Sequence, residues 1–172
     1  NAVLAESKRP LLLLRDEVPK TGDRLRVGIA VDGSAYGEAA TDYVLAHKDF
    51  FGADPDFRVL HVVRDYQTLV ATTSVEYVMP TVTTEEFEKS TAEEFEKTVE
   101  PVLKRFEQAD VPVQAEKLTG FASDAIAEYA KSELDILVIG SHGYGNFKSA
   151  VLGSTAMHIA AECKVPLLVV RH

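Results

Sequence analysis

Hydrophobic and polar positions follow a repeating order from residue 26 to the end of the chain. Short apolar runs of the kind that buried strands give alternate with stretches of helical periodicity. The runs predict five strands, at about 27–31, 57–63, 113–118, 134–139 and 166–170. The periodic stretches predict four helices, at about 36–44, 85–109, 123–132 and 154–162. This alternation predicts one α/β domain of Rossmann-like type, a doubly wound five-stranded parallel sheet with helices on both faces.

Some segments depart from this order. Residues 1–23 have no sustained period and are interpreted as an N-terminal extension of a domain that comprises residues 24–172. Within the extension, Leu11–Leu14 have the apolar character to pack on the domain or on a partner. Residues 64–84 are predicted to form a long loop, and a lid over a ligand and a merely flexible connection are equally compatible with it. Pro101 is predicted to kink or interrupt the helix at 85–109.

Charge and cysteine content narrow the classes of function. The formal net charge is −9, from 27 acidic and 18 basic residues, which argues against nonspecific nucleic-acid binding and against attraction to anionic membranes. The apolar stretches fall short of the ~20 residues of a membrane span, and Leu11–Leu14 is too short for the core of a signal peptide. The one cysteine, Cys163, excludes an intramolecular disulfide and a zinc cluster. We therefore expect a soluble, cytoplasmic protein.

The segment 140–154 is rich in glycine and lies between a predicted strand and a predicted helix. Its spacing is Gly-x2-Gly-x9-Gly-Ser, filled by Gly140, Gly143, Gly153 and Ser154. Glycines let backbone N–H groups approach an anion closely, and a helix N-terminus adds free N–H donors. Between residues 140 and 161 there is no acidic residue. The segment is therefore interpreted as a phosphate-binding loop.

Two better-known phosphate loops do not fit this segment. A P-loop requires lysine where Asn146 stands, and a dinucleotide-binding loop requires a third glycine where Lys148 stands. The observed spacing, together with residues 27–32, 60–63 and 166–170, instead resembles the universal stress protein A-like family, in its ATP-binding branch. The resemblance covers about residues 24–172. It implies the Rossmann-like fold of the adenine nucleotide alpha hydrolases and a bound adenine nucleotide, either ATP or its products ADP and AMP.

The resemblance also implies roles for individual residues. Asp32 corresponds to the acidic residue at the adenine and ribose end, Val62 to the residue whose backbone reads the adenine edge, and Gly140 to a neighbour of the ribose. Four residues correspond to the phosphate site, with room for a divalent ion such as Mg²⁺ among them: Gly143, Gly153, Ser154 and Thr155. The same cleft is expected to be lined by Ala30, Val31, Ile139 and His142. Tyr144 and Phe147 depart from the pattern, which leaves the number of bound phosphates open.

Three functions are compatible with these residues. A regulatory protein that binds ATP is preferred; a slow ATP hydrolase and a nucleotide-free dimeric scaffold are the alternatives. Efficient hydrolysis is disfavoured because the motif contains neither a Walker lysine nor an arginine. The intact glycine pattern disfavours the scaffold.

Two polar residues of the expected site have a second interpretation. His142 is interpreted as a loop histidine and not as a general base, because no carboxylate in the motif is spaced to orient it. Asp32 is interpreted as a ligand residue, with capping of the turn before the first helix as the alternative. No catalytic residue is predicted. The family resemblance further implies a homodimer through the strand at 166–170.

Overall fold

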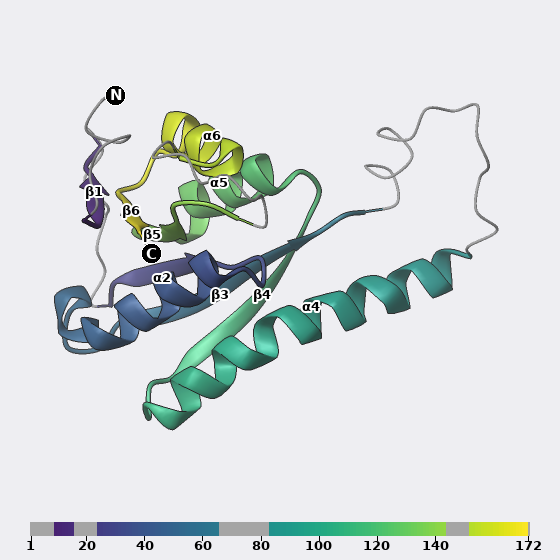
Figure 1. The fold of residues 1–172 in the computed structure, drawn as a ribbon, viewed down its shortest axis with the longest axis horizontal. Helices are drawn as coiled ribbons and strands as arrows, with labels where there is room; N and C mark the ends of the chain where they lie inside the picture. Colours follow the sequence, from purple (N-terminus) through teal and green to yellow (C-terminus); the bar gives the residue numbers. More distant parts are fainter. Residues whose placement is uncertain (1–8, 16–23, 66–82, 144–151, 172) are drawn as a thin grey trace.

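One sheet lies between two layers of helices in the computed structural model, which describes residues 9–15, 24–65, 83–143 and 152–171 (Figure 1). The strands stand in the order β1-β6-β5-β2-β3-β4. Their bounds are β1 Leu11–Leu13, β2 Arg26–Ala30, β3 Asp56–Val63, β4 Val113–Thr119, β5 Ile136–Gly140 and β6 Leu167–Val170. The helices are α2 Ala35–Ala46, α4 Thr84–Gln108, α5 Ala122–Glu133 and α6 Ser154–Glu162, with a short 3-10 helix at Lys48–Phe51.

The helices divide the core into two apolar clusters, one on each face of the sheet. On one face α2 and α4 cover the sheet with residues such as Val44, Val102 and Phe106. On the other face α5 and α6 cover it with residues such as Ile126 and Ile159. Figure 1 shows these two layers on opposite sides of the strands. The predicted doubly wound architecture is therefore confirmed, as are all four predicted helices.

The predicted count of five strands was wrong, because the sheet has a sixth. Leu11–Leu13, which the sequence placed in an extension, pair antiparallel with β6 in the register Leu12 to Leu168. Three residues are too few to show a period, so the pattern gave no strand signal there. Arg15 strengthens the attachment by donating a hydrogen bond to the carbonyl of Ala160 near the end of α6. The five strands β2 to β6 are mutually parallel, as predicted.

Pro101 does not interrupt α4, so this alternative of the prediction was wrong, while a kink at Pro101 stays a prediction. The helix runs without a break from Thr84 to Gln108. A proline inside a helix deprives the carbonyl four residues earlier of its hydrogen-bond donor, and here that carbonyl belongs to Lys97. Both residues are exposed, while Val99 and Val102 face the core. Water can therefore serve the freed carbonyl, and the buried side of the helix stays intact.

The order of the strands creates a branching point between β2 and β5. From β2 the chain proceeds outward through β3 to β4, whereas from β5 it proceeds in the other direction to β6. The connections that leave the carboxyl ends of β2 and β5 therefore diverge, and in open α/β sheets ligands bind in the resulting crevice. The sequence pattern contained no information on this order.

A partly buried ion pair fixes β2 against β5 at the opposite end of the two strands. The Arg26 guanidinium donates two hydrogen bonds to the Asp135 carboxylate, at 3.1 and 3.0 Å, and the Arg26 backbone N–H donates a third at 2.9 Å. Asp135 in turn donates its backbone N–H to the carbonyl of Arg26 at 2.9 Å. The Asp135 side chain is 1% exposed. Its burial acts to raise its pKa, but the hydrogen bonds from Arg26 outweigh burial and hold the pKa below its ordinary value.

Asp135→Asn is expected to lower the free energy of unfolding at neutral pH by about 2 kcal/mol, measured by urea denaturation. The variant leaves the Arg26 charge without its partner, and the loss stays below that of a fully buried pair because Arg26 keeps contact with water. The matched control is Asp54→Asn, which breaks an ion pair with Arg24 whose two side chains are 53% and 70% exposed. The control is expected to cost less than about 0.5 kcal/mol, and equal losses would contradict the assignment.

The same pair predicts a pH dependence of stability. The pKa of Asp135 is lowered in the folded state, so its contribution is present above the unfolded pKa and is lost as the pH falls through the folded one. Wild type and Asp135→Asn are therefore expected to differ at pH 7 and to converge as the pH falls below about 4. A constant difference in stability from pH 7 to pH 3 would refute this account.

Candidate functional site

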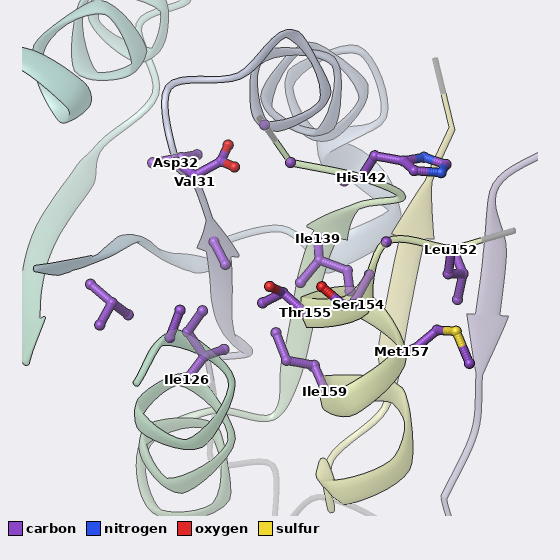
Figure 2. Close-up of a pocket in the computed structure, with 18 of the residues that line it drawn as sticks. Val31, Asp32, Ile126, Ile139, His142, Leu152, Ser154, Thr155, Met157 and Ile159 are labelled. Carbon is purple, nitrogen blue, oxygen red and sulfur yellow. The ribbon is translucent and has the colours of Figure 1, made fainter. Parts of the chain in front are cut away.

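A cavity of about 540 Å³ lies at the branching point, beyond the carboxyl ends of β2 and β5. Figure 2 shows its labelled residues arranged around the hollow between these strands, α5 and the start of α6. All of the site residues predicted from the sequence line this one cavity: Ala30, Val31, Asp32, Val62, Ile139, Gly140, His142, Gly143, Gly153, Ser154 and Thr155. Their contact with a ligand remains a prediction.

One part of the cavity is apolar. Val62 and Ile139 contribute from the sheet, and Ile126 and Ile159 contribute from α5 and α6. These side chains belong to the cluster on the α5 and α6 face, so the cavity lies on that face of the sheet. Such a lining with few polar groups is typical of sites that take a planar or apolar part of a small molecule.

The N-terminus of α6 forms the polar part of the cavity. Gly153 is the N-cap residue, no side chain among the described residues caps the helix, and the first turn contains no acidic residue. The first backbone N–H groups of a helix have no partner within it, and together they carry a partial positive charge. In Figure 2 the hydroxyls of Ser154 and Thr155 lie on the cavity side of the helix. This arrangement can hold an anion without a lysine or arginine.

Asp32 carries the negative charge of the cavity. It follows β2, and its Oδ1 accepts hydrogen bonds from the Ser34 N–H at 3.0 Å and from the Ser34 hydroxyl at 2.5 Å. Ser34 is also the N-cap of α2, as its hydroxyl accepts from the N–H of Gly37. The turn is therefore stabilised by Ser34 as well as by Asp32, and Oδ2 is directed toward Gly143. Among the described residues that line the cavity, none is lysine or arginine.

The glycines of the motif permit close contacts within the protein. A Cβ on Gly140 would lie 2.6 Å from the carbonyl oxygen of Tyr36 in α2, and a Cβ on Gly143 would lie 2.5 Å from Oδ2 of Asp32. Gly153 closes the loop by donating its N–H to the carbonyl of Ser141 at 2.9 Å. The motif therefore brings α2, Asp32 and α6 together around the cavity.

His142 lines the cavity, but its side chain points away from the hollow. Its ring lies 5.0 Å from the ring of Tyr36, centre to centre, and its Nδ1 is 3.1 Å from the Ser141 hydroxyl. In Figure 2 the side chain points away from Asp32, Ser154 and Thr155. This orientation agrees with the interpretation of His142 as a loop histidine and does not suit a general base.

Several cavity residues were not predicted as part of the site. Ile126 was recognised only as an inward-facing residue of its helix, and Ile159 and Met157 carried no signal beyond helical periodicity. Apolar positions that line a cavity and apolar positions that fill a core look alike in a sequence. Tyr144 and Phe147, which depart from the family pattern, lie outside the described residues, as does most of the expected loop at 64–84. Among the described residues there is no cluster of potential metal ligands.

Solved structures of similar fold come from several organisms. The structure of protein MJ0577 has a TM-score of 0.68 and 25% identity, over 86% of this chain and 96% of that one. A universal stress protein family member from Arabidopsis thaliana, solved with AMP bound, has a TM-score of 0.59 at 18% identity, over 86% and 92%. A universal stress protein solved in complex with cAMP has a TM-score of 0.54 at 17% identity, over 85% and 95%. The last two establish a shared fold.

Sequence comparison points to the same group of proteins. The universal stress protein MJ0577 of Methanocaldococcus jannaschii is 31% identical over 87 residues, which are 50% of this chain and 54% of that protein. The universal stress protein Slr1230 of Synechocystis sp. is 33% identical over 75 residues, 43% of this chain and 25% of that protein. The matches thus span about half and a quarter of these relatives. None of the described helices has the length and apolar character to cross a membrane.

The family comparison covers the whole region that forms the parallel sheet and the cavity. The model described as the universal stress protein family matches residues 24–171 and leaves β1 outside the match. The chain therefore belongs to the universal stress protein family.

Proposed function

We propose that the chain binds an adenine nucleotide in the cavity, with ATP as the first candidate and ADP or AMP as the others. It acts in this proposal as a regulatory protein that changes its conformation or its partners when the nucleotide is bound. The observation that carries the proposal is the combination of an apolar pocket with the uncapped N-terminus of α6 in one cavity. Each part matches one end of a nucleotide.

The apolar part suits the adenine ring. Val62, Ile126 and Ile139 offer aliphatic contact to the two faces of a planar base. Val62 is the penultimate residue of β3. Its backbone is proposed to read the edge of the adenine. Asp32 is proposed to contact the ribose, and Ala30 and Val31 to support it from the end of β2.

The polar part suits the phosphates. The N–H groups at the start of α6 and the hydroxyls of Ser154 and Thr155 are donors, as an anion requires. Gly143 and Gly153 keep the backbone on both sides of the loop free of side chains. A divalent ion fits this site as a counter-ion of the phosphates. Asp32, the carboxylate among the described lining residues, already accepts two hydrogen bonds from Ser34.

Relatives support adenine nucleotides as the ligand class, since one structure of the same fold contains AMP and another contains cAMP. The two alternative functions are less well supported. Rapid hydrolysis requires positive charge placed around the γ-phosphate, and the described cavity residues include no lysine or arginine. A nucleotide-free scaffold would not need a cavity of about 540 Å³ at the branching point.

A homodimer through β6 is a further part of the proposal. In the structure β1 is hydrogen-bonded along the edge of β6 that such a dimer would use. Unpaired sheet edges favour pairing with a second chain. A second copy is therefore proposed to reach β6 only when β1 leaves it.

Nucleotide binding is tested by the content of the purified protein and by calorimetry. Protein that is denatured after purification is expected to release ATP, ADP or AMP, identified by chromatography. Protein freed of nucleotide is expected to bind ATP in titration calorimetry and to gain thermal stability from it. An empty cavity, together with an unchanged melting temperature in ATP and Mg²⁺, would refute the proposal.

Ser154→Ala combined with Thr155→Ala is expected to weaken ATP binding about tenfold, because the two hydroxyl donors to the phosphates are lost. Adenosine, which has no phosphate, is expected to bind wild type and variant equally. The matched control is Ser132→Ala on the exposed last turn of α5, for which both affinities should stay unchanged. A parallel loss for ATP and adenosine would contradict the proposed phosphate site.

Leu13→Asp is expected to increase the dimer fraction measured by analytical ultracentrifugation. Leu13 packs half-buried against the core cluster of α6, so a charge there should dislodge β1 and uncover β6. Leu14→Asp is the matched control, because Leu14 is 74% exposed and follows the paired residues. If Leu13→Asp remains monomeric at every concentration while still folded, the dimer through β6 is wrong.

A further inference from the structure

His61 lies near the end of β3 on the face of the sheet that α4 covers. Side chains alternate between the two faces along a strand. Val59, two residues earlier, belongs to the core cluster of α4, whereas Leu60 belongs to the cluster of α5 and α6. The His61 ring accordingly lies 6.3 Å from the ring of Phe95 in α4, centre to centre. The residue is 6% exposed and is one of the residues that line the cavity, while its ring lies on the α4 side of the sheet.

One ring nitrogen of His61 holds the carbonyl at the end of β2. The Nδ1 atom is 2.9 Å from the carbonyl oxygen of Val31. A carbonyl oxygen can only accept, so Nδ1 carries the proton and donates. The N–H of Val31 donates to the carbonyl of Leu60 at 2.9 Å. Both backbone groups of Val31 are therefore hydrogen-bonded to β3. The N–H is bound to the backbone of Leu60, and the carbonyl is bound to the side chain of His61.

This hydrogen bond sets the direction in which the chain leaves β2. The described peptide bonds are all trans, so the Val31 carbonyl and the N–H of Asp32 point in opposite directions from one rigid plane. A fixed carbonyl therefore fixes the start of the turn that carries Asp32. The Oδ2 atom of Asp32 then faces Gly143, and its Oδ1 atom accepts a hydrogen bond from Ser34.

The other ring nitrogen is not needed for this arrangement. Nε2 is buried and has no hydrogen-bond partner among the described residues. Among the described residues, the carboxylate oxygen Oε1 of Glu94 in α4 lies 3.9 Å away at an exposed position. The distance exceeds that of a hydrogen bond. Loss of the Glu94 charge would therefore leave the bond from Nδ1 to Val31 in place.

We propose that His61 is a positioning residue for Asp32, acting from the opposite face of the sheet through the carbonyl of Val31. The inference rests on the proposed function, because Asp32 is there assigned to the nucleotide. It adds a residue that lines the cavity, and whose ring, on the α4 side of the sheet, affects the affinity through Asp32. Since His61 also packs against Phe95, it joins the cavity to α4, whose first turns extend beyond the sheet in Figure 1.

The first test needs no ligand. His61→Leu removes the donor, whereas His61→Asn keeps an amide nitrogen two bonds from Cβ, as Nδ1 is. In amide NMR spectra of the nucleotide-free protein, His61→Leu is expected to shift the signals of Asp32 and Gly143, and His61→Asn is expected to restore them. Glu94→Gln is the matched control and should leave both signals in place. Unshifted signals in His61→Leu would overturn the proposal, whether or not the protein binds nucleotide.

The second test measures AMP affinity by calorimetry in a double-mutant cycle. His61→Leu is expected to bind AMP about tenfold more weakly, as the loss of one buried hydrogen bond allows, while His61→Asn and Glu94→Gln bind like wild type. In an Asp32→Ala background, His61→Leu should have no further effect, because it acts through Asp32. If the losses of AMP affinity caused by His61→Leu and by Asp32→Ala multiplied in the double variant, the positioning role would be overturned. Absence of binding of both ATP and AMP to wild type would instead refute the proposed function.

Discussion

The contact between β2 and β5 is the constraint on which the rest of the structure depends. These two strands pair in the middle of the sheet, and the chain leaves them in opposite directions. At one end Arg26 and Asp135 fix their register by a partly buried ion pair that also uses the backbone. At the other end, Gly140 lies directly against the backbone of Tyr36 at the start of α2. The cavity exists because the strands are held together while their connections diverge.

The glycine motif has two physical roles in this arrangement. The role expected from the sequence is to keep backbone N–H groups accessible to an anion. The geometry adds a second role, since Cβ atoms at Gly140 and Gly143 would collide with Tyr36 and Asp32. Each glycine thus lets one structural element approach another around the cavity. A substitution there would disturb the shape of the site before any ligand is bound.

The helix α6 joins the cavity to the edge of the sheet. Its N-terminus faces the cavity, while its last turn accepts a hydrogen bond from Arg15 in the segment that contains β1. A positive charge at the C-terminus of a helix and an anion at its N-terminus both suit the helix dipole. The segment around β1 lies outside the region matched by the family. The segment that contains β1 is thus attached to the helix that borders the cavity.

The sequence by itself determined the helices, the parallel strands and the motif around which the cavity forms. These features depend on local periodicity and on spacing along the chain, which remain visible without a fold. Only the tertiary structure decided the order of the strands, the pairing of Leu11–Leu13 with β6 and the apolar lining by Ile126 and Ile159. The bond from His61 to Val31 joins residues thirty positions apart. Such contacts arise when distant segments meet in space, and residue types alone do not encode which segments meet.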